Sequence, residues 1–463
     1  MIRPTRTWRA AAVGTAALLV LTACGGDTEE TPSASDNTST TTEETPTPDA
    51  EDTPAAAEEC EVKEFPNVTG NGTLTIGTLL PQTGSLAFLG PPEFAAVELA
   101  VRDMNAAGGV LGNPVKKIDS DSGDAQNPIA SQSVDRLFSK NVDVIIGAAS
   151  SSVSLLVIDK ITNAGVVQIS PANTSDAFST YCDNGLYFRT APPDTLQGRV
   201  LADTIIADGN QTVGIMALQD AYGTGLAGHV EKNVTASNGE VIEKIIYDPK
   251  AANYATEVSS IRAADPDAIV VIGFAETQKI IPELIKQGIG PDTKKIYFVD
   301  GNLADYSEAF DPGVLGPNVK GTLPGVAATE ELKQQLLTVN PDLDNFSYAA
   351  ESYDATVLAG LAAIAADSDA GPAIAAELVG VSKDGAKCDS FEKCKQLLQD
   401  GEDIDYEGFS GPVNFLENGD PGVAFIGIYQ YKPDNTYEFV ESRRGEITSG
   451  DIAEAAEAAE DAE

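Results

Sequence analysis

Two short polar segments, each following an apolar run, have the residue types of an anion-binding site. Residues 149–152 (Ala-Ser-Ser-Ser) follow the β-branched run 143–148, and residues 171–174 (Pro-Ala-Asn-Thr) follow the run 166–170. We expect both runs to be buried strands of one parallel sheet. Consecutive parallel strands bring the segments after them to the same sheet edge, where ligands of open α/β sheets bind.

A helix is predicted between these two segments, with Ser152 or Ser151 as its N-cap residue. Helix N-termini carry free N–H groups and bind anions without a cationic side chain. The serines are equally explained as a simple helix cap, and Thr174 as a turn residue. The pattern therefore predicts half of a binding site, without a reaction.

The chain lacks the residue patterns of the common catalytic sites. It contains no Gly-x-Ser-x-Gly elbow, no NTPase phosphate loop and no dinucleotide glycine fingerprint. Its single histidine, His229, falls within a predicted helix with no evident partner. A hydrolase with paired carboxylates is the rival class, but 71 acidic residues produce such pairs by chance. We expect a binding protein that is not an enzyme and needs no cofactor or metal.

The charge of the chain excludes nucleic acid as a partner. The formal net charge is −42, and removal of residues 1–23, with three Arg and no acid, would bring it to −45. Such a chain is repelled by nucleic acid and by anionic lipid surfaces.

The ends of the chain differ in composition from the rest. Residues 1–23 have a basic start and a short apolar run, as a signal peptide does, and the Leu-Thr-Ala-Cys sequence ending at Cys24 resembles the bacterial lipoprotein cleavage box. Residues 24–59, rich in Thr, Pro and Glu, are predicted to be a disordered tether. Residues 444–463 are expected to form an acidic tail. We therefore expect an extracytoplasmic protein held to the membrane by a lipid on Cys24.

Four further cysteines, an even number in an exported chain, indicate disulfides. Cys388 and Cys394 flank the start of a predicted helix with Asp389 as N-cap, which favours their pairing and leaves Cys60 with Cys182. A zinc site is the alternative, but the chain has no Cys-x-x-Cys pair and only one His.

Strands and helices alternate over most of the chain, which indicates an α/β fold. One series of units begins at Leu74 and contains the two polar segments, and a second begins near Asp194. Helices after Val326 are too many for the second series alone and are expected to cover the first. The pattern predicts two lobes, each a doubly wound parallel sheet.

Many short sequences, in a specific order from about residue 72 to 440, resemble one family. They are Thr75-Ile76-Gly77, Pro81-x-Thr83-Gly84, Gly90, 103–113 (Asp-Met-Asn-Ala-Ala-Gly-Gly-Val-Leu-Gly-Asn), Ile145-Ile146-Gly147, Ser150-Ser151-Ser152, 169–174, Phe188-Arg189-Thr190, Gln197-Gly198, Asp220-x-Tyr222-Gly223, Tyr353-Asp354-Ala355 and Phe409-x-Gly411-x-x-x-Phe415. The chain resembles a type I periplasmic binding protein of the branched-chain amino-acid (Leu/Ile/Val) transport class.

The resemblance implies a Venus-flytrap architecture, with the ligand in a cleft between two lobes joined by three crossover segments. By position, the crossovers lie near residues 191–195, 323–327 and 406–411. The implied first lobe comprises residues 60–192 plus 326–407, and the second comprises 193–325 plus 408–443.

The resemblance also implies how an amino acid is held by its two charged ends. The carboxylate would contact Ser151, with Ser150 as a close rival, and Thr174. The Ala172 carbonyl would accept from the ammonium group, and Asp300 of the second lobe would pair with it on closure. Asp300 before Gly301 is also an ordinary turn residue.

Four more positions bear on the ligand. Tyr222 matches a cleft aromatic residue, and Phe274 is expected to line the pocket near the end of its strand. Glu276 is an alternative acid. Leu89 stands where the family often has a larger or aromatic residue, which leaves the side-chain pocket open.

The function implied is that of a lipid-anchored solute-binding protein of an ABC importer, with the permease subunits and the membrane as partners. A branched-chain amino acid is the expected ligand. Binders of an amide, urea or aromatic acid are alternatives, against which Asp300 argues, and a ligand-sensing receptor on the same fold is another.

Overall fold

The computed structural model describes residues 60, 62–125 and 127–453, all within one compact unit that begins at Glu59. The predicted signal peptide, Cys24 and the whole of the predicted tether lie outside the described residues. No helix among those described is long and apolar enough to cross a membrane.

The first sheet is fully parallel, with the order β2-β1-β3-β4-β5. Its strands are β1 (Thr75–Leu80), β2 (Lys116–Asp121), β3 (Val144–Gly147), β4 (Val167–Ser170) and β5 (Tyr187–Arg189). The order reverses between β1 and β3, so the segments after these two strands diverge and leave a crevice at the sheet edge. The two polar segments predicted from the sequence follow β3 and β4, at this edge.

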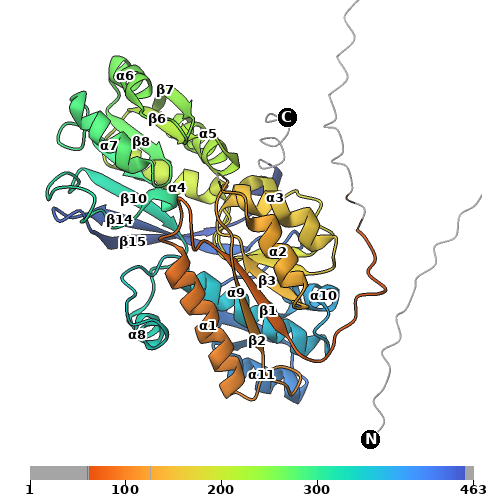
Figure 1. Cartoon of the computed structure of the whole chain (residues 1–463). Coiled ribbons are helices and arrows are strands. Elements are labelled where there is room, and N and C mark those ends of the chain that lie inside the picture. Colours follow the sequence, from red (N-terminus) through yellow and green to blue (C-terminus); the bar gives the residue numbers. More distant parts are fainter. Residues whose placement is uncertain (1–59, 61, 126, 454–463) are drawn as a thin grey trace, which may run out of the picture. The chain divides into compact units, whose positions relative to one another are not determined.

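Helices cover both faces of the first sheet because successive strand residues point to opposite faces. Ile76 and Leu80 pack in the core with α1 (Gly90–Ala106) and α9 (Ala349–Ala365), whereas Leu79 packs with α2 (Ala130–Phe138) and α3 (Ser151–Thr162). Figure 1 shows α1 on one side of β1 and β2, and α2 and α3 on the other.

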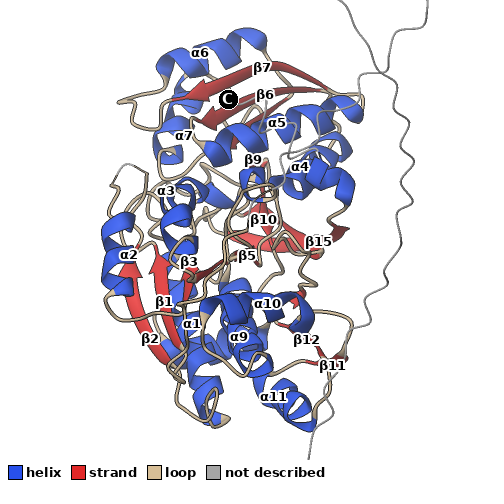
Figure 2. Ribbon diagram, turned by 90° about the vertical axis from the view of Figure 1, so that its right-hand side faces the viewer, coloured by secondary structure: helices blue, strands red, loops and turns tan. Residues whose placement is uncertain are grey.

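Three further helices complete the first lobe. They are α8 (Glu330–Val339), α10 (Gly371–Val381) and α11 (Phe391–Asp400). All three share the core of α1 and α9, as predicted for helices after Val326. A small sheet of β11 (Ala386–Cys388), β12 (Ile404–Gly408) and β13 (Gly411–Pro412) lies beside α10 and α11 (Figure 2).

The second sheet has the order β15-β14-β10-β9-β8-β6-β7. Its parallel strands are β6 (Thr212–Leu218), β7 (Glu240–Tyr247), β8 (Ala268–Ile272), β9 (Lys295–Phe298) and β10 (Val319–Pro324). Two antiparallel strands, β14 (Val423–Tyr431) and β15 (Tyr437–Glu446), extend it beyond β10. Its helices are α4 (Asp194–Ala207), α5 (Ala221–Ala236), α6 (Ala255–Ala264) and α7 (Thr277–Lys286). Two single helical turns complete the list: η1 (Asp176–Phe178) lies between β4 and β5 of the first lobe, and η2 (Asp300–Asn302) follows β9. Two doubly wound lobes are therefore present, as predicted.

The chain passes between the two sheets three times. It leaves the first sheet after β5 and enters α4 of the second lobe, and it returns after β10 to reach α8. The third passage lies later than predicted, because Val413 and Phe415 are still packed in the first-lobe core. Residues 408–415 therefore do not belong to the second lobe, contrary to the predicted boundary at 408.

The second lobe also extends further than predicted at its C-terminal end. Strand β15 continues to Glu446, which pairs with Val423, so the acidic tail does not begin at residue 444. Ile447 and Ile452 then pack against Leu196 and Ile426, and Asp451 contacts Arg199. The antiparallel ladder and this apolar contact fix the segment.

Both predicted disulfides are confirmed, Cys60–Cys182 and Cys388–Cys394. The N-cap residue of α11 is Ser390 and not Asp389, whose carboxylate instead contacts Lys393 at the surface. The two bonds close loops of very different length, with sequence separations of 122 and 6 residues.

Glu351, in the first turn of α9, lies where two of the passages meet. Its backbone carbonyl accepts a hydrogen bond from Thr190 Oγ1 at 3.0 Å, just after β5. A Cβ atom on Gly325, just after β10, would lie 2.0 Å from Glu351 Oε1, so glycine is required there. The side chain is 2% exposed, and burial raises its pKa to about 8.

Removal of Cys60–Cys182 by a double Ser substitution should cost more stability than removal of Cys388–Cys394. Loop-closure entropy gives about 5 kcal/mol for the longer loop and about 2 kcal/mol for the shorter one. Urea unfolding of both variants measures the difference, and the opposite ranking would contradict it.

Glu351→Gln should gain stability relative to the wild type as the pH rises from about 5 to 8. The folded-state pKa of Glu351 lies above its unfolded value of 4.5, so the wild type loses stability as the pH rises toward about 8. Urea unfolding at both pH values measures the gap between the two proteins. The exposed Glu392→Gln is the control, and a gap that does not widen for Glu351→Gln would contradict the assignment.

Candidate functional site

A small cavity of about 10 Å³ lies between the carboxyl ends of the strands of both sheets. From the first lobe it is lined by Leu86, Leu89, Ala149, Ser150, Ser151, Ala172, Thr174 and Tyr348, and from the second by Tyr222, Phe274, Asp300 and Gly301. This volume is barely enough for one water molecule and far below the roughly 300–1,000 Å³ of drug-sized sites, so a bound ligand requires the two walls to lie further apart.

All seven residues predicted for the ligand site line this one cavity, although four separate segments of the first lobe and three of the second contribute to it. Leu89 lines it as well. Glu276, the alternative acid, does not: its Oε1 accepts from Phe274 N and from Tyr247 OH, each at 2.9 Å. The structure thus separates the two candidate acids and brings Asp300 to the cavity.

The first wall is the N-terminus of α3. Ser150 is its N-cap residue, with extended backbone angles and a side chain that accepts from Val153 N at 3.4 Å. The predicted caps, Ser151 and Ser152, are wrong, because both already lie within the helix and use their hydroxyls elsewhere. Ser151 Oγ accepts from Ser175 N at 3.3 Å, which leaves its own O–H hydrogen available. The N–H groups of Ser151 and Ser152 have no intrahelical acceptor, as in the first turn of any helix.

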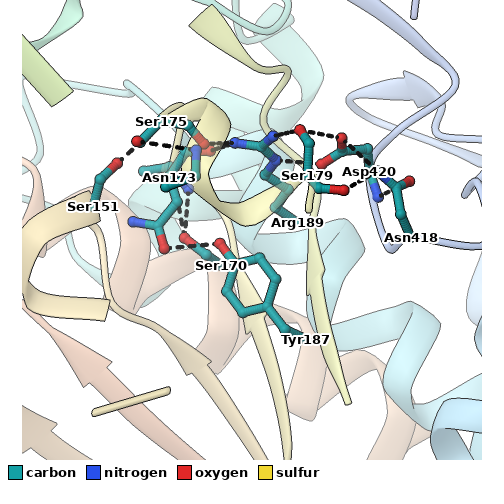
Figure 3. A network of polar contacts seen from close by, with 11 residues as sticks. Ser151, Ser170, Asn173, Ser175, Ser179, Tyr187, Arg189, Asn418 and Asp420 are labelled. Carbon is teal, nitrogen blue, oxygen red and sulfur yellow. Dashed lines mark hydrogen bonds and ion pairs between the residues drawn. The ribbon is translucent and has the colours of Figure 1, made fainter. Parts of the chain in front are cut away.

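The second wall is the turn after β4, which an extensive polar network holds rigid (Figure 3). Ser170 Oγ accepts from Ala172 N at 3.3 Å and from Asn173 N at 2.9 Å. The Asn173 amide donates to the Ala149 carbonyl and accepts from Tyr187 OH, each at 2.9 Å. The turn is therefore fixed to both neighbouring strands of the sheet.

This network leaves two backbone groups of the turn available. Within the described part of the chain, neither the Ala172 carbonyl nor the Thr174 N–H has an assigned hydrogen bond, whereas the Thr174 carbonyl accepts from Asp194 N at 2.7 Å. Both residues line the cavity. One wall of the cavity thus offers several donors and a carbonyl acceptor.

The opposite wall carries a buried carboxylate, that of Asp300 in η2. Its Oδ1 accepts from Tyr222 OH at 2.7 Å and from Gln197 Nε2 at 2.9 Å, and its Oδ2 accepts from Tyr348 OH at 2.8 Å. Burial raises the pKa of Asp300, and these three donors oppose that rise. A carboxylate accepts about four hydrogen bonds, so one position remains for a ligand.

The remaining surface of the cavity is apolar. The rings of Tyr222 and Phe274 lie parallel, with centroids 5.6 Å apart, and face the side of Leu86 and Leu89. A Cβ atom on Gly301 would lie 2.8 Å from the Phe274 ring, so the ring packs directly on the backbone. No Lys, Arg or His is among the residues that line the cavity.

Asp194, at the start of α4, is a second acid beside this site that the sequence did not identify. It is fully buried, and within the described structure neither of its carboxylate oxygens has a hydrogen-bond partner. Burial, then Asp176 and Asp300, raise its pKa, while the Thr174 hydroxyl lowers it. Tyr348 and Gln197 were also missed, since neither has a sequence context that marks a contact with Asp300.

Contacts between the lobes surround the cavity, so the structure represents a closed cleft. Ser152 Oγ donates to Asp220 Oδ2 at 3.1 Å, and Ser175 Oγ donates to the Ala221 carbonyl at 3.2 Å. His229, expected to lack a partner, contacts the Asp176 carboxylate of the first lobe. The core of the second lobe is continuous with Leu86, Leu89, Ala149, Ala172 and Tyr348.

Tyr348→Phe should destabilise the closed protein by about 1.5–3 kcal/mol, because Asp300 would stay buried with one charged hydrogen bond fewer. Tyr306→Phe is the matched control: its hydroxyl donates at 2.9 Å to the neutral Asn302 carbonyl of the same lobe, a bond worth about 1 kcal/mol. Urea unfolding of both variants gives the comparison. Equal losses of unfolding free energy would show that the hydrogen bond to Asp300 contributes no more than one between neutral groups.

Comparison with known proteins identifies the family. The family model described as periplasmic binding protein matches residues 73–425. A chemotactic signal transduction system substrate-binding protein, BasB of Halobacterium salinarum, is 24% identical over 371 residues, which cover 76% of this chain and 86% of the relative.

Two solved structures share the fold. The branched-chain amino-acid transporter substrate-binding protein LivJ of Streptococcus pneumoniae, in complex with isoleucine, has a TM-score of 0.64 at 21% identity, covering 81% of this chain and 99% of its own. An ABC transporter solute-binding protein of R. palustris, in complex with benzoate, has a TM-score of 0.63 at 19% identity, covering 80% and 96%. The predicted family is confirmed: the chain belongs to the periplasmic binding protein family.

Proposed function

We propose that the protein binds a small α-amino acid in the closed cleft, as the extracytoplasmic, lipid-anchored solute-binding protein of an ABC importer. One observation carries the proposal. A single buried cavity has a donor-rich wall on the first lobe and the Asp300 carboxylate on the second, with no cationic side chain among its lining residues. That combination suits a zwitterion, which brings its own positive charge.

The anionic end of the ligand belongs at the first lobe. The N–H groups of Ser151, Ser152 and Thr174 and the Ser151 hydroxyl are the available donors, and the N-terminus of α3 adds its dipole. Hydrogen bonds of this kind to a charged group are stronger than those between neutral groups.

The ammonium end has three N–H donors and needs three acceptors. The Ala172 carbonyl, the Thr174 hydroxyl oxygen and the remaining position on Asp300 supply that number at one end of the cavity. Asp194 lies near the same end: its buried carboxyl group interacts with Asp300, and a cation there would favour the charged form of both groups. A buried carboxylate without such a cation is costly.

The apolar surface favours a ligand with a short hydrocarbon side chain. Leu86, Leu89 and Phe274 offer no polar atom to a side chain, and a short side chain requires the least separation of the walls. LivJ, which shares the fold, was solved with isoleucine. A branched-chain amino acid therefore fits the site best.

An aromatic acid such as the benzoate of the R. palustris protein is the second candidate class. Such a ligand has a carboxylate for the first lobe but no cation for Asp300 or Asp194. Both carboxylates would then have to remain neutral or unpaired, which disfavours this class. An amide or urea meets the same objection.

Cleft closure would be a hinge motion of the two lobes, since ligand contacts on both favour the closed state.

Lipid attachment at Cys24 would keep the protein near the permease subunits. Mass spectrometry of the mature N-terminus tests the attachment, and an unmodified Cys24 would contradict it. A ligand-sensing receptor, the class that the name of BasB describes, would bind the same ligand with a different partner.

A thermal unfolding panel tests the ligand class. Leucine, isoleucine and valine at about a thousand times Kd should each stabilise the purified protein by roughly 4 kcal/mol, whereas leucinamide and benzoate should have little effect. Stabilisation by benzoate without stabilisation by any amino acid would contradict the proposal.

Asp300→Asn should weaken amino-acid binding at least about 100-fold, because the ammonium loses its charged partner in a buried site. The melting temperature of the ligand-free variant should change little, because removal of a buried charge offsets the loss of the Oδ2 acceptor for Tyr348, and the amide oxygen still accepts from Tyr222. Glu276→Gln is the control, as it removes a buried acid outside the cavity. Titration calorimetry measures both affinities, and unchanged binding by Asp300→Asn would remove Asp300 from the site.

A further inference from the structure

The rigid turn that carries Ala172 and Thr174 depends on an ion pair that does not itself reach the cavity. Arg189, the last residue of β5, is completely buried, and its Nε donates to Asp420 Oδ1 at 2.6 Å. The two residues are separated by 231 positions in the sequence. Figure 3 shows Arg189 between the turn on one side and Asp420 on the other.

The guanidinium group holds the two carbonyls that flank Thr174. Nη1 donates to the Asn173 carbonyl at 3.3 Å and to the Ser175 carbonyl at 2.8 Å. The Asn173 carbonyl shares its peptide group with the N–H of Thr174, so its bond to Arg189 fixes the orientation of that N–H. The Ser175 carbonyl fixes the peptide group that follows Ser175. The N–H of Ser175 donates to Ser151 Oγ, which extends the same control to the serine at the start of α3.

A third residue locks the ion pair in one geometry. Ser179 Oγ accepts from Arg189 Nη2 at 2.9 Å and donates to Asp420 Oδ2 at 2.7 Å. The Arg189 guanidinium therefore makes four distinct contacts in one plane, a pattern that the point charge of a lysine cannot reproduce.

Asp420 is delivered by the loop of the third passage between the lobes. The N–H of Arg189 donates to the Gly419 carbonyl at 3.0 Å, and Asn418 Nδ2 donates to Asp420 Oδ2 at 3.0 Å. Gly419 has a φ of +81°, and a Cβ atom there would lie 2.2 Å from the Tyr187 carbonyl, so only glycine allows this approach. A segment more than 200 residues from the turn thus determines the position of the guanidinium.

We infer that Asp420 and Arg189 are positioning residues for the ligand site: they orient Thr174 and Ser151 for the ligand without touching it. The inference rests on the proposed function, since it concerns the same cavity. It predicts that the affinity for the ligand depends on Asp420 of the third passage, although this residue does not line the cavity.

Asp420→Asn should raise the Kd of the tightest-binding amino acid at least about tenfold, because Arg189 loses its charged anchor and the turn its fixed orientation. Ser179→Ala removes only the bridging hydroxyl and should raise Kd about threefold or more, which keeps the test available if Asp420→Asn does not fold. Arg189→Lys should also bind more weakly than the wild type, because a lysine ammonium cannot reproduce the forked set of hydrogen bonds that the guanidinium group makes.

Asp369→Asn is the matched control for a general loss of stability. Asp369 is likewise a buried carboxylate that fixes a distant loop, accepting from Asn71 N, Gly72 N and Thr73 N at 2.9–3.1 Å, but it does not line the cavity. This variant should lower the melting temperature and leave Kd within about twofold of the wild type.

Calorimetric Kd and the ligand-free melting temperature are measured for every variant. Wild-type Kd in Ser179→Ala and in any folded Asp420→Asn would overturn the inference, as would an equal loss of affinity in Asp369→Asn. A wild-type protein that binds none of the amino acids would contradict the proposed function itself. The two failures are therefore distinguishable.

Discussion

The Asp300 carboxylate is buried between two lobes, among neutral donors, with no cationic side chain lining its cavity. Desolvation of an ionised carboxylate is costly, and Tyr222, Gln197 and Tyr348 offset only part of that cost. Asp194 adds a second buried carboxyl group nearby. The closed cleft is thus electrostatically incomplete without a cation, and the donor-rich wall opposite is incomplete without an anion. An amino acid supplies both charges at a fixed separation.

The fold accounts for how these two walls meet. In each lobe the order of the parallel strands reverses beside the first strand of the sheet, and both crevices face the cleft. The first-lobe wall is rigid, since Ser170, Asn173 and Arg189 hold its turn to neighbouring strands and to the loop at Asp420 (Figure 3). The second-lobe wall reaches it through Tyr348 and the contacts at Asp220 and His229. In the proposed function, ligand affinity and cleft closure would therefore depend on the same set of hydrogen bonds.

Much of this arrangement could be predicted from the sequence, because local patterns determine it. Apolar runs followed by serine and threonine predicted β3, β4 and the segments after them. The spacing of Cys388 and Cys394 predicted one of the two disulfides. The resemblance to a family added Tyr222, Phe274 and Asp300 to the same cavity. The N-cap was placed one or two residues late because a run of three serines has no local feature that selects Ser150.

Other features depend on contacts between distant segments and could not be predicted in this way. Tyr348 precedes α9 with a φ of +57° and reaches Asp300 across the cleft, a contact that no local pattern marks. Asp194 was seen only as the start of the second lobe. His229 had no partner within its own helix, and its contact with Asp176 joins separate lobes. The third passage was placed too early because the apolar Val413 and Phe415 fit either lobe by composition.

The crystal structure of the protein with its tightest-binding amino acid is the most direct test of the account. We predict a ligand carboxylate within hydrogen-bond distance of Ser151 and the Thr174 N–H, and an ammonium group in contact with Asp300 Oδ2 and the Ala172 carbonyl. A ligand bound instead in the larger aromatic groove at Phe88, Phe346 and Tyr437, or a reversed ligand with its carboxylate at Asp300, would contradict it.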